Sequence, residues 1–520
     1  MARYFNVAGP CNEDDHYMIE ASSRLSGIRE LIDQRQYFVI HAPRQSGKTT
    51  LLLDLVNHIN REGKYYALYC SLEVAQDIID PAEGIPIVVD CIANALECSQ
   101  IHGRDEFANY SHNGSYGLLL LRALTKFCRS SDKPLIIFFD EADCLSEGTL
   151  ISFLRQLRNG YNTRAQIPFV HSIALVGMRN IRDFKVRIRP DSESLGSASP
   201  FNVIKEAMTF SNFTKEEAVE LYGQHTAETG QVFEQEAIDL VIKQTQGQPW
   251  LVNAIACEVI EKMLQSDYTK PVTAELVEQA IQTIILRRDT HIDSLLERLK
   301  EERVRRVIEP VIIGELSEIH TQSDDYLYTR DLGLIKENKG VIMPANPIYA
   351  EVIIRTLSAD SQKDLLESKY PQQMPHYLKN GHIDMTCLMQ DFQAFWRENS
   401  EIWIDRYKYR EAAPHLILQA FLQRVVNGGG QIIREFAAGY KRLDLCVEYA
   451  GQKYPVELKL RRSAKTEENS YTQILGYMDR LGAKEGWLLI FDRRPDIDWD
   501  AKIYLKTETV EGKTVTIVGC

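Results

Sequence analysis

The stretch Ala42-Pro-Arg-Gln-Ser-Gly-Lys-Thr49 decides the fold of the N-terminal half of the chain. An apolar run at residues 37–41 precedes it, and a leucine-rich segment of helical periodicity follows it at residues 48–59. A glycine-containing loop between a strand and a helix directs backbone N–H groups and a helix N-terminus at one place, where they bind phosphate. The position of the stretch, as much as its spelling, therefore predicts a phosphate-binding loop.

Each polar residue of this loop has an expected contact with a nucleoside triphosphate. Backbone N–H groups around Ser46 and Gly47 would hold the β-phosphate. Lys48 would reach the β and γ oxygens, and Thr49 would ligate Mg²⁺. Ala42 replaces the first glycine of the usual pattern, which is tolerable if its φ stays negative. The predicted ATP contacts are Arg44, Gln45, Ser46, Gly47, Lys48, Thr49 and Thr50.

A second apolar run, at residues 135–139, ends in the carboxylates Asp140 and Glu141. In enzymes that transfer or hydrolyse phosphates, such a first acid holds Mg²⁺ and the second polarises the attacking water. We therefore assign Asp140 to the metal and Glu141 to catalysis. Asp143 is interpreted as a solvated or helix-capping acid.

Apolar runs alternate with helical patterns across residues 1–195, which we assign to the ATPase core. The runs at 134–139 and 169–176 are too continuous for strands buried on one side only, which indicates a parallel sheet covered on both faces. The fold class is therefore multidomain α/β. From residue 214 the pattern is wholly helical, and residues 196–290 are expected to form a helical lid.

Residues 20–260 resemble the STAND and archaeal-type branch of the AAA+ ATPases in the phosphate loop, the acidic pair and the element Gly247-Gln-Pro249. The resemblance implies an ATP-binding and ATP-hydrolysing switch that forms homo-oligomers. It also implies that Pro249 packs against adenine and that Arg179 senses the γ-phosphate. From the sequence alone, an ordinary strand-ending arginine explains Arg179 equally well. Residues 291–357 fit the winged-helix-like domain that such ATPases often carry.

The C-terminal region contains a predicted hairpin. Residues 442–460 alternate as two half-buried strands do, with a turn at Ala450-Gly451. A turn there brings Asp444 opposite Glu457. The two-residue spacing also places Lys459 on the same face as Glu457. Two carboxylates and an amine are therefore expected to converge.

Such a convergence suits phosphodiester hydrolysis. The acids would hold Mg²⁺ or Mn²⁺ and lower the pKa of a bound water, while the lysine would orient that water or stabilise developing negative charge. A solvated strand face, on which acids and lysines alternate for solubility, would show the same spacing. The spacing alone does not separate the two interpretations.

Residues 406–495 are similar to the PD-(D/E)XK nuclease superfamily, and Gln473-Ile-Leu-Gly-Tyr477 is similar to an element of its RecB-like branch. Leu443 stands where the family usually has proline. We assign residues 406–520 to this domain, residues 358–405 to a helical linker, and residues 486–491 to the strand that completes the sheet. The resemblance implies metal ligation by Glu411, Asp444 and Glu457, catalysis by Lys459 with both acids, and substrate contact by Gln473 and Tyr477. Arg442 and Arg461 belong to a local basic ridge that suits phosphate contact, although solvated surface charges would show the same pattern.

Composition limits the class of protein. With 44% hydrophobic and 26% charged residues the chain reads as globular, and no apolar stretch is long enough to span a bilayer. Its ten cysteines include no CxxC pair, which favours free thiols and a cytoplasmic protein. A net charge of −13 argues against indiscriminate coating of nucleic acid, so any contact must be regional.

The leading hypothesis is an ATP-controlled, metal-dependent nuclease that cleaves DNA in DNA processing or antiviral defence. A second is a STAND-type signalling or scaffold ATPase whose C-terminal domain binds nucleic acid or a partner without cutting. A third, a transcriptional regulator, is disfavoured because residues 291–357 contain no strongly basic recognition helix.

Overall fold

The computed structural model describes residues 3–20, 26–43, 45–101, 107, 115–177, 203–287, 290–313, 319–367, 374–406, 413–426, 431–435, 444–461, 466–492, 494, 497–510 and 512–520. The chain forms two compact units. One contains Met1–Ile284 and Asp331–Gly333, and the other contains Ile285–Arg330 and Leu334–Cys520. None of the described helices is long and apolar enough to cross a membrane.

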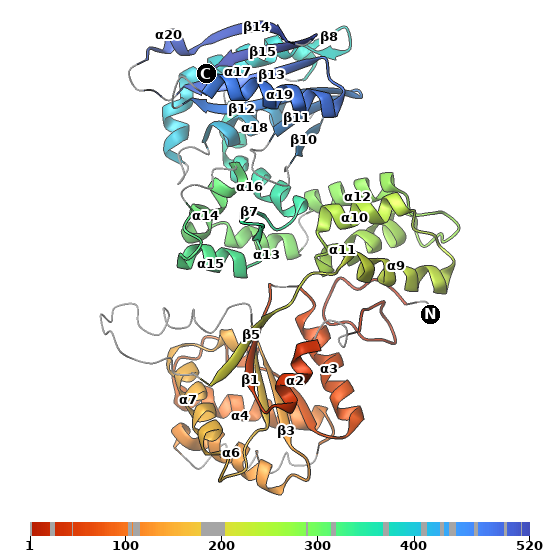
Figure 1. The fold of residues 1–520 in the computed structure, drawn as a ribbon, viewed down its shortest axis with the longest axis vertical. Coiled ribbons are helices and arrows are strands. Elements are labelled where there is room, and N and C mark those ends of the chain that lie inside the picture. Colours follow the sequence, from red (N-terminus) through yellow and green to blue (C-terminus); the bar gives the residue numbers. More distant parts are fainter. Residues whose placement is uncertain are drawn as a thin grey trace. The chain divides into compact units, whose positions relative to one another are not determined.

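A parallel sheet with the strand order β2-β3-β4-β1-β5 forms the centre of the first unit (Figure 1). Its strands are β1 (Tyr37–His41), β2 (Tyr66–Ser71), β3 (Leu135–Asp140), β4 (Ser172–Gly177) and β5 (Ile204–Thr209). The first four confirm the predicted apolar runs. We did not predict β5, because this edge strand is mostly exposed and has no continuous apolar run to reveal it.

The two faces of this sheet carry separate hydrophobic cores, because successive residues of a strand point to opposite sides. Val39 and Phe139 face the core that includes α4, α6 and α7, whereas Ile40 and Phe138 face the core that includes α2 and α3 (Figure 1). The covering helices are α2 (Ser26–Asp33), α3 (Lys48–Glu62), α4 (Pro81–Cys98), α6 (Tyr116–Ser130) and α7 (Glu147–Thr163). Coverage of both faces confirms the predicted α/β architecture.

Helices alone follow the sheet in the first unit. They are α9 (Lys215–Thr229), α10 (Gln235–Thr245), α11 (Pro249–Cys257), which continues as a π-helix (Glu258–Met263), and α12 (Ala274–Arg287). The helical conformation is interrupted between α10 and α11 at Gln246 and Gly247, whose φ values are 51° and 72°. A Cβ on Gly247 would lie 2.0 Å from the Phe213 carbonyl oxygen, so glycine is required at this turn.

The second unit begins with helices and a small hairpin. Its elements are α13 (Thr290–Arg298), α14 (Glu302–Ile313), α15 (Asp324–Asp331), β6 (Ile335–Asn338), β7 (Val341–Pro344) and α16 (Pro347–Glu367). The antiparallel pair β6–β7 lies within residues 291–357, for which we expected a winged-helix-like domain. Helix α15 begins with two aspartates, Asp324 and Asp325, which makes it a poor partner for DNA phosphates.

The remainder of the second unit is built on a mixed sheet with the order β10-β11-β12-β13-β15-β14. A 3-10 turn (Met374–Tyr377) and the short strands β8 (Leu378–Lys379) and β9 (His382–Ile383) precede it. Its elements are α17 (Met385–Arg406), α18 (Ala413–Val426), β10 (Gln431–Glu435), β11 (Asp444–Tyr449), β12 (Gln452–Arg461), α19 (Thr466–Leu481), β13 (Glu485–Asp492), α20 (Trp499–Lys502), β14 (Tyr504–Val510) and β15 (Lys513–Gly519).

The prediction that residues 486–491 complete the sheet is wrong, since β15 pairs with β13 and β14 pairs with β15. Residues 486–491 of β13 are buried throughout, so this strand needs a neighbour along each edge to satisfy its backbone groups.

Candidate functional site

The phosphate loop connects β1 to α3 in the first unit. Gly47 precedes the first residue of α3 with a φ of 84°, and Gln45 has a φ of 56°. Ala42, in contrast, is not among the described residues with positive φ, so it meets the condition under which it can replace glycine. The Ser46 hydroxyl donates to the Pro43 carbonyl at 2.8 Å. The predicted contact Arg44 lies outside the described residues.

Lys48 is buried at the start of α3, with 6% of its surface exposed. Its ammonium donates to two loop carbonyls, Ala42 O at 2.8 Å and Pro43 O at 3.0 Å. These contacts hold the charge against the concave side of the loop. Phosphate oxygens, which are stronger acceptors than a neutral carbonyl, can replace the carbonyls when a nucleotide binds.

Asp140 at the end of β3 gathers three donors. Its Oδ2 accepts from the Thr49 hydroxyl at 3.0 Å and from the Tyr69 hydroxyl at 2.9 Å, and its Oδ1 accepts from the Glu141 amide at 3.0 Å. Thr49 and Asp140, each predicted as a Mg²⁺ ligand, therefore lie in contact. A hydroxyl beside a buried carboxylate fits the oxygen donors that Mg²⁺ prefers, and Thr49 and Asp140 are the residues that would hold it with ATP.

Tyr69 is a member of this site that sequence reasoning missed. It lies on β2, next to β3, and points its hydroxyl at Asp140. Burial, and then the neighbouring Asp140 carboxylate, raise the pKa of Tyr69 far above its ordinary value. The phenol therefore stays protonated and donates at neutral pH. No local sequence signal marks it, because a tyrosine in a strand is ordinary.

Two further acids, Glu141 and Asp143, follow Asp140, and they differ in backbone conformation and burial. Glu141 follows β3 with a φ of 52°, in the left-handed region that a glutamate rarely occupies, so the turn itself orients the side chain. Asp143 lies in the short 3-10 helix Ala142–Cys144 and is buried. Our interpretation of Asp143 as a solvated acid is wrong. A Cβ on Gly177 would lie 2.4 Å from Asp143 Oδ1, so the glycine leaves the space that this carboxyl fills.

The helical lid contacts the phosphate loop through Gln248. Its side-chain amide donates to the Gln45 carbonyl at 3.1 Å, and its Oε1 accepts from the Leu251 amide at 2.6 Å. Pro249, buried at the first position of α11, is thereby held next to the loop. Its predicted adenine contact stays a prediction. Arg179, the predicted sensor, lies outside the described residues.

The N-terminal segment is a further part of this region that sequence reasoning missed. The Cys11 amide donates to the Thr50 hydroxyl at 2.9 Å, and the Trp250 indole donates to the Val7 carbonyl at 2.9 Å. Thr50 thus contacts the N-terminal segment, and its predicted contact with ATP stays a prediction. The segment joins α3 to α11 and borders the nucleotide site.

The second candidate site lies on the β11–β12 hairpin. Leu445 pairs with Val456, and in the same register Asp444 is the residue opposite Glu457. The turn at Ala450 and Gly451, with φ values of 49° and 77°, confirms the predicted hairpin. The backbone of Asp444 is described, whereas its side chain is not.

Two buried charges meet on β12. Glu457 is 1% exposed and Lys459 is 7% exposed. The Lys459 ammonium forms an ion pair with Glu457 Oε1 and donates to Gln473 Oε1 of α19. Glu457 Oε2 is buried and has no hydrogen-bond partner in the part of the chain that the structure describes. The predicted Glu457, Lys459 and Gln473 are therefore together.

The remaining predicted residues of this site are only partly described. Tyr477 is fully buried on α19 in the hydrophobic core beside β13, and Arg461 lies at the end of β12. Glu411 and Arg442 lie outside the described residues. Among the residues that are described, no three His, Cys, Asp or Glu side chains form a metal-binding group. The roles of Glu411, Arg442, Arg461 and Tyr477 stay predictions.

Comparison with known proteins places the first of these two sites in a family. A model of the AAA-like domain matches residues 7–354. The Walker-type ATPase PABY2304 of Pyrococcus abyssi is similar, with a TM-score of 0.45 and 14% identity over 67% of this chain and 99% of that one.

Two further solved structures are more distant. Cdc6p from Pyrobaculum aerophilum has a TM-score of 0.36 and 14% identity over 65% of this chain and 94% of its own. The RuvB Holliday junction branch migration motor of Thermotoga maritima has a TM-score of 0.33 and 12% identity over 68% and 95%. Likenesses this remote carry no argument about activity. The curated proteins contain no match. Because the AAA-like model spans more than half of the 520 residues and the loop, lysine and acids are in place, this chain belongs to the AAA-like family of P-loop ATPases.

Proposed function

We propose that this ATPase is a switch that controls a metal-dependent nuclease located in its C-terminal part, and that the nuclease cleaves phosphodiester bonds in DNA. The domain boundaries given above, a cytoplasmic location and assembly into a homo-oligomer belong to the same proposal. ATP binding by the first unit follows from the family. The nuclease rests on the hairpin site.

The observation that carries the proposal is the second oxygen of Glu457. Burying an ionised carboxylate costs on the order of several kcal/mol unless each charge is paired and hydrogen-bonded. Lys459 balances Oε1, while buried Oε2 has no partner among the described residues. A divalent cation that reaches Oε2 would supply the missing partner. The donor type fits, because Mg²⁺ and Mn²⁺ prefer carboxylate oxygens.

The order of elements supports the same interpretation. Helix α18, the antiparallel strands β10, β11 and β12, helix α19 and the parallel strand β13 follow one another around the site. This is the element order that the resemblance to PD-(D/E)XK nucleases implies. It places the acids on the central strands and Gln473 on the helix that packs over them.

Each residue has a distinct proposed task. A bound Mg²⁺ or Mn²⁺ would polarise the scissile phosphate and lower the pKa of an attacking water. Glu457 and Asp444 would hold the cation. Lys459 would leave its ion pair with Glu457 and place its ammonium beside the charge that develops on the phosphate, while Gln473 keeps that ammonium oriented.

A plasmid-cleavage assay tests the proposal. Wild type, Asp444→Ala and Lys459→Ala are incubated with supercoiled DNA in Mg²⁺ or Mn²⁺, with and without ATP. We expect cleavage by wild type only, and unchanged ATP binding in all three. Glu448→Ala and Lys453→Ala, which remove an acid and a lysine paired on the same hairpin away from the site, serve as matched controls and should cleave normally.

Two results would contradict the nuclease. Equal nicking by wild type and Asp444→Ala would point to a contaminating enzyme. Cleavage by none of the proteins on single-stranded or duplex DNA or RNA, with or without ATP, would favour a signalling or scaffold ATPase whose C-terminal part binds without cutting.

A further inference from the structure

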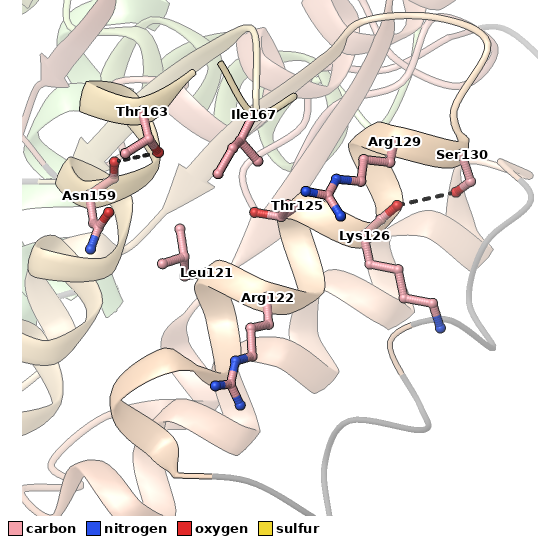
Figure 2. A pocket seen from close by; sticks show the side chains of 9 residues that line it. All are labelled: Leu121, Arg122, Thr125, Lys126, Arg129, Ser130, Asn159, Thr163 and Ile167. Carbon is pink, nitrogen blue, oxygen red and sulfur yellow. Dashed lines mark hydrogen bonds between the residues drawn. The ribbon is translucent and has the colours of Figure 1, made fainter. Parts of the chain in front are cut away.

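A hollow of about 610 Å³ lies between α6 and α7 on the surface of the ATPase core (Figure 2). Residues within 121–130 of α6, Asn159 and Thr163 near the end of α7, and Ile167 form its lining. Ser130, at the end of α6, comes just before β3 begins, whereas Asp140 lies where β3 ends. The hollow therefore lies towards the N-terminal ends of the parallel strands, whereas the nucleotide site lies at their C-terminal ends. The hollow is no part of the ATP pocket.

The lining of this hollow is positively charged. Arg122, Lys126 and Arg129 line it from α6, and none of its lining residues is acidic. Helix α6 contains no Asp or Glu, and α7 contains only Glu147, at its first position. In a chain with a net charge of −13, two adjacent helices with this bias form a local positive region.

Helix stabilisation does not account for all of these cations. A positive charge in the last turn of a helix is favoured by the macrodipole, which explains Arg129. Arg122 lies in the second turn of α6, where that effect has faded. In the described part of the chain, neither arginine has a carboxylate within 4.0 Å, so their charge is available to a ligand.

The spacing of the cations suits a linear polyanion. Residues 122, 126 and 129 lie on one face of a helix, and the seven-residue interval spans about 10 Å along its axis. One strand of duplex nucleic acid advances about 3.4 Å per phosphate along its axis, so the row covers roughly three phosphates. Figure 2 shows the charged side chains along one helix and Asn159 and Thr163 on the other.

The floor of the hollow adds a second type of contact. Leu121 and Ile167 supply apolar surface, and the Asn159 amide supplies polar groups. Sugars and base faces pack on apolar side chains, while amides donate to phosphate oxygens.

We propose that this α6–α7 hollow binds the sugar-phosphate backbone of nucleic acid. It shares the nucleic-acid partner of the proposed nuclease but does not use the C-terminal site. Binding here would hold nucleic acid on the ATPase core, and neither a divalent cation nor cleavage would be required.

Fluorescence anisotropy with the full-length protein tests this inference. The probes are a labelled 30-nucleotide single-stranded DNA, the same sequence as duplex DNA, and the same sequence as RNA, all in EDTA over a salt series. The variant is Arg122→Ala/Arg129→Ala. The matched control, Arg61→Ala/Lys243→Ala, also removes two charges, from exposed positions on α3 and α10.

We expect the α6 variant to lower affinity for duplex DNA and to reduce the slope of log K against log salt by about two, since each phosphate contact contributes about 0.9. The control should retain the wild-type slope. Unchanged ATP affinity in both variants shows that the core is folded. Comparison of the three probes identifies which nucleic acid the hollow prefers.

Three results would overturn the inference. The first is that wild type binds none of the probes in EDTA. The second is that the α6 variant binds with the same affinity as wild type. The third is that the control loses as much affinity as the α6 variant, which would mean that net charge alone matters. If the α6 variant instead dissociates an oligomer in sedimentation without changing nucleic-acid affinity, the hollow is a protein interface. If wild type binds the probes in EDTA but does not cleave plasmid DNA in Mg²⁺ or Mn²⁺, the proposed nuclease is contradicted and the proposed hollow is not.

Discussion

The nucleotide site and the hairpin site each place carboxylates where a divalent cation is expected, but they balance the negative charge differently. Asp140 receives three hydrogen bonds from Thr49, Tyr69 and the Glu141 amide. Glu457 is as deeply buried, yet its Oε2 has no partner among the described residues. The first site is therefore held together by its own donors, whereas the second leaves one carboxylate oxygen for the cation that we propose.

The largest effect should come from removing the buried ammonium of the nucleotide site. Lys48→Ala is expected to weaken ATP binding by about 2 to 5 kcal/mol, or roughly 30- to 5,000-fold, since truncating a buried, hydrogen-bonded charge has this effect. Isothermal titration calorimetry measures it. Lys64→Ala, which removes an exposed lysine paired with Asp33, is the control and should bind ATP normally. Equal ATP affinities for the two variants would show that Lys48 does not contact the nucleotide.

The next effect sharpens the contrast at the hairpin. Mn²⁺ or Mg²⁺ should stabilise the wild-type second unit by about 2.7 kcal/mol when present at 100 times its Kd, because it binds the folded carboxylates. Glu457→Gln should abolish this shift, since the amide is a much weaker cation ligand. Thermal unfolding with and without metal measures it, and Glu448→Gln on the same hairpin is the control. A metal shift that survives Glu457→Gln would contradict the assignment.

A smaller effect is expected from Tyr69→Phe, which removes one donor from Asp140 and leaves the ring in place. Loss of one hydrogen bond amounts to about 0.5 to 1.5 kcal/mol, so ATP hydrolysis should fall by roughly 2- to 12-fold. The Mg²⁺ dependence of hydrolysis should shift with it. Tyr66→Phe is the control on the same strand as Tyr69; the Tyr66 hydroxyl donates to Asp132, away from the site, so this change should leave both unchanged. Identical rates of ATP hydrolysis for the two variants would show that the hydrogen bond from Tyr69 to Asp140 does not contribute to hydrolysis.

The smallest effect should follow Gln248→Ala, which breaks the contact between the lid and the phosphate loop. At 3.1 Å the bond to the Gln45 carbonyl is expected to contribute about 0.5 kcal/mol, the low end of the range for a hydrogen bond, so ATP affinity should fall by roughly 2-fold while the hairpin site keeps its metal response. Gln235→Ala, which removes an exposed contact to Asp239 on α10, is the control. A change at the hairpin without a change in ATP affinity would be the opposite of what we expect.

Several elements of both sites were predictable because their signals are local. The loop at residues 42–49 is recognisable from its strand, glycine and helix, and Asp140 from the apolar run before it. Each of the two motifs predicted one Mg²⁺ ligand, Thr49 and Asp140, whereas the hydrogen bond between them is a finding of the structure. The hairpin turn at Ala450 and Gly451 was predictable for the same reason, because alternation and turn chemistry are read over a few residues.

Other parts could not be predicted because their cause lies elsewhere in the chain. Asp143 reads as a surface acid until Gly177, which has no side chain, is seen to leave space for it. Strand β14 has no continuous apolar run, and β15 is short; their places in the sheet depend on β13, which needs a neighbour along its second edge.

The sequence by itself determined that the chain has a phosphate loop, an acidic pair and an acid-and-lysine hairpin, since local periodicity and turn chemistry specify these directly. Only the tertiary structure decided that Tyr69 completes the Asp140 site, that Gln248 contacts the loop, and that α6 and α7 form a basic hollow. Hydrogen bonds and charge clusters between distant segments depend on how helices pack on the sheet, and no short stretch of residues records that packing.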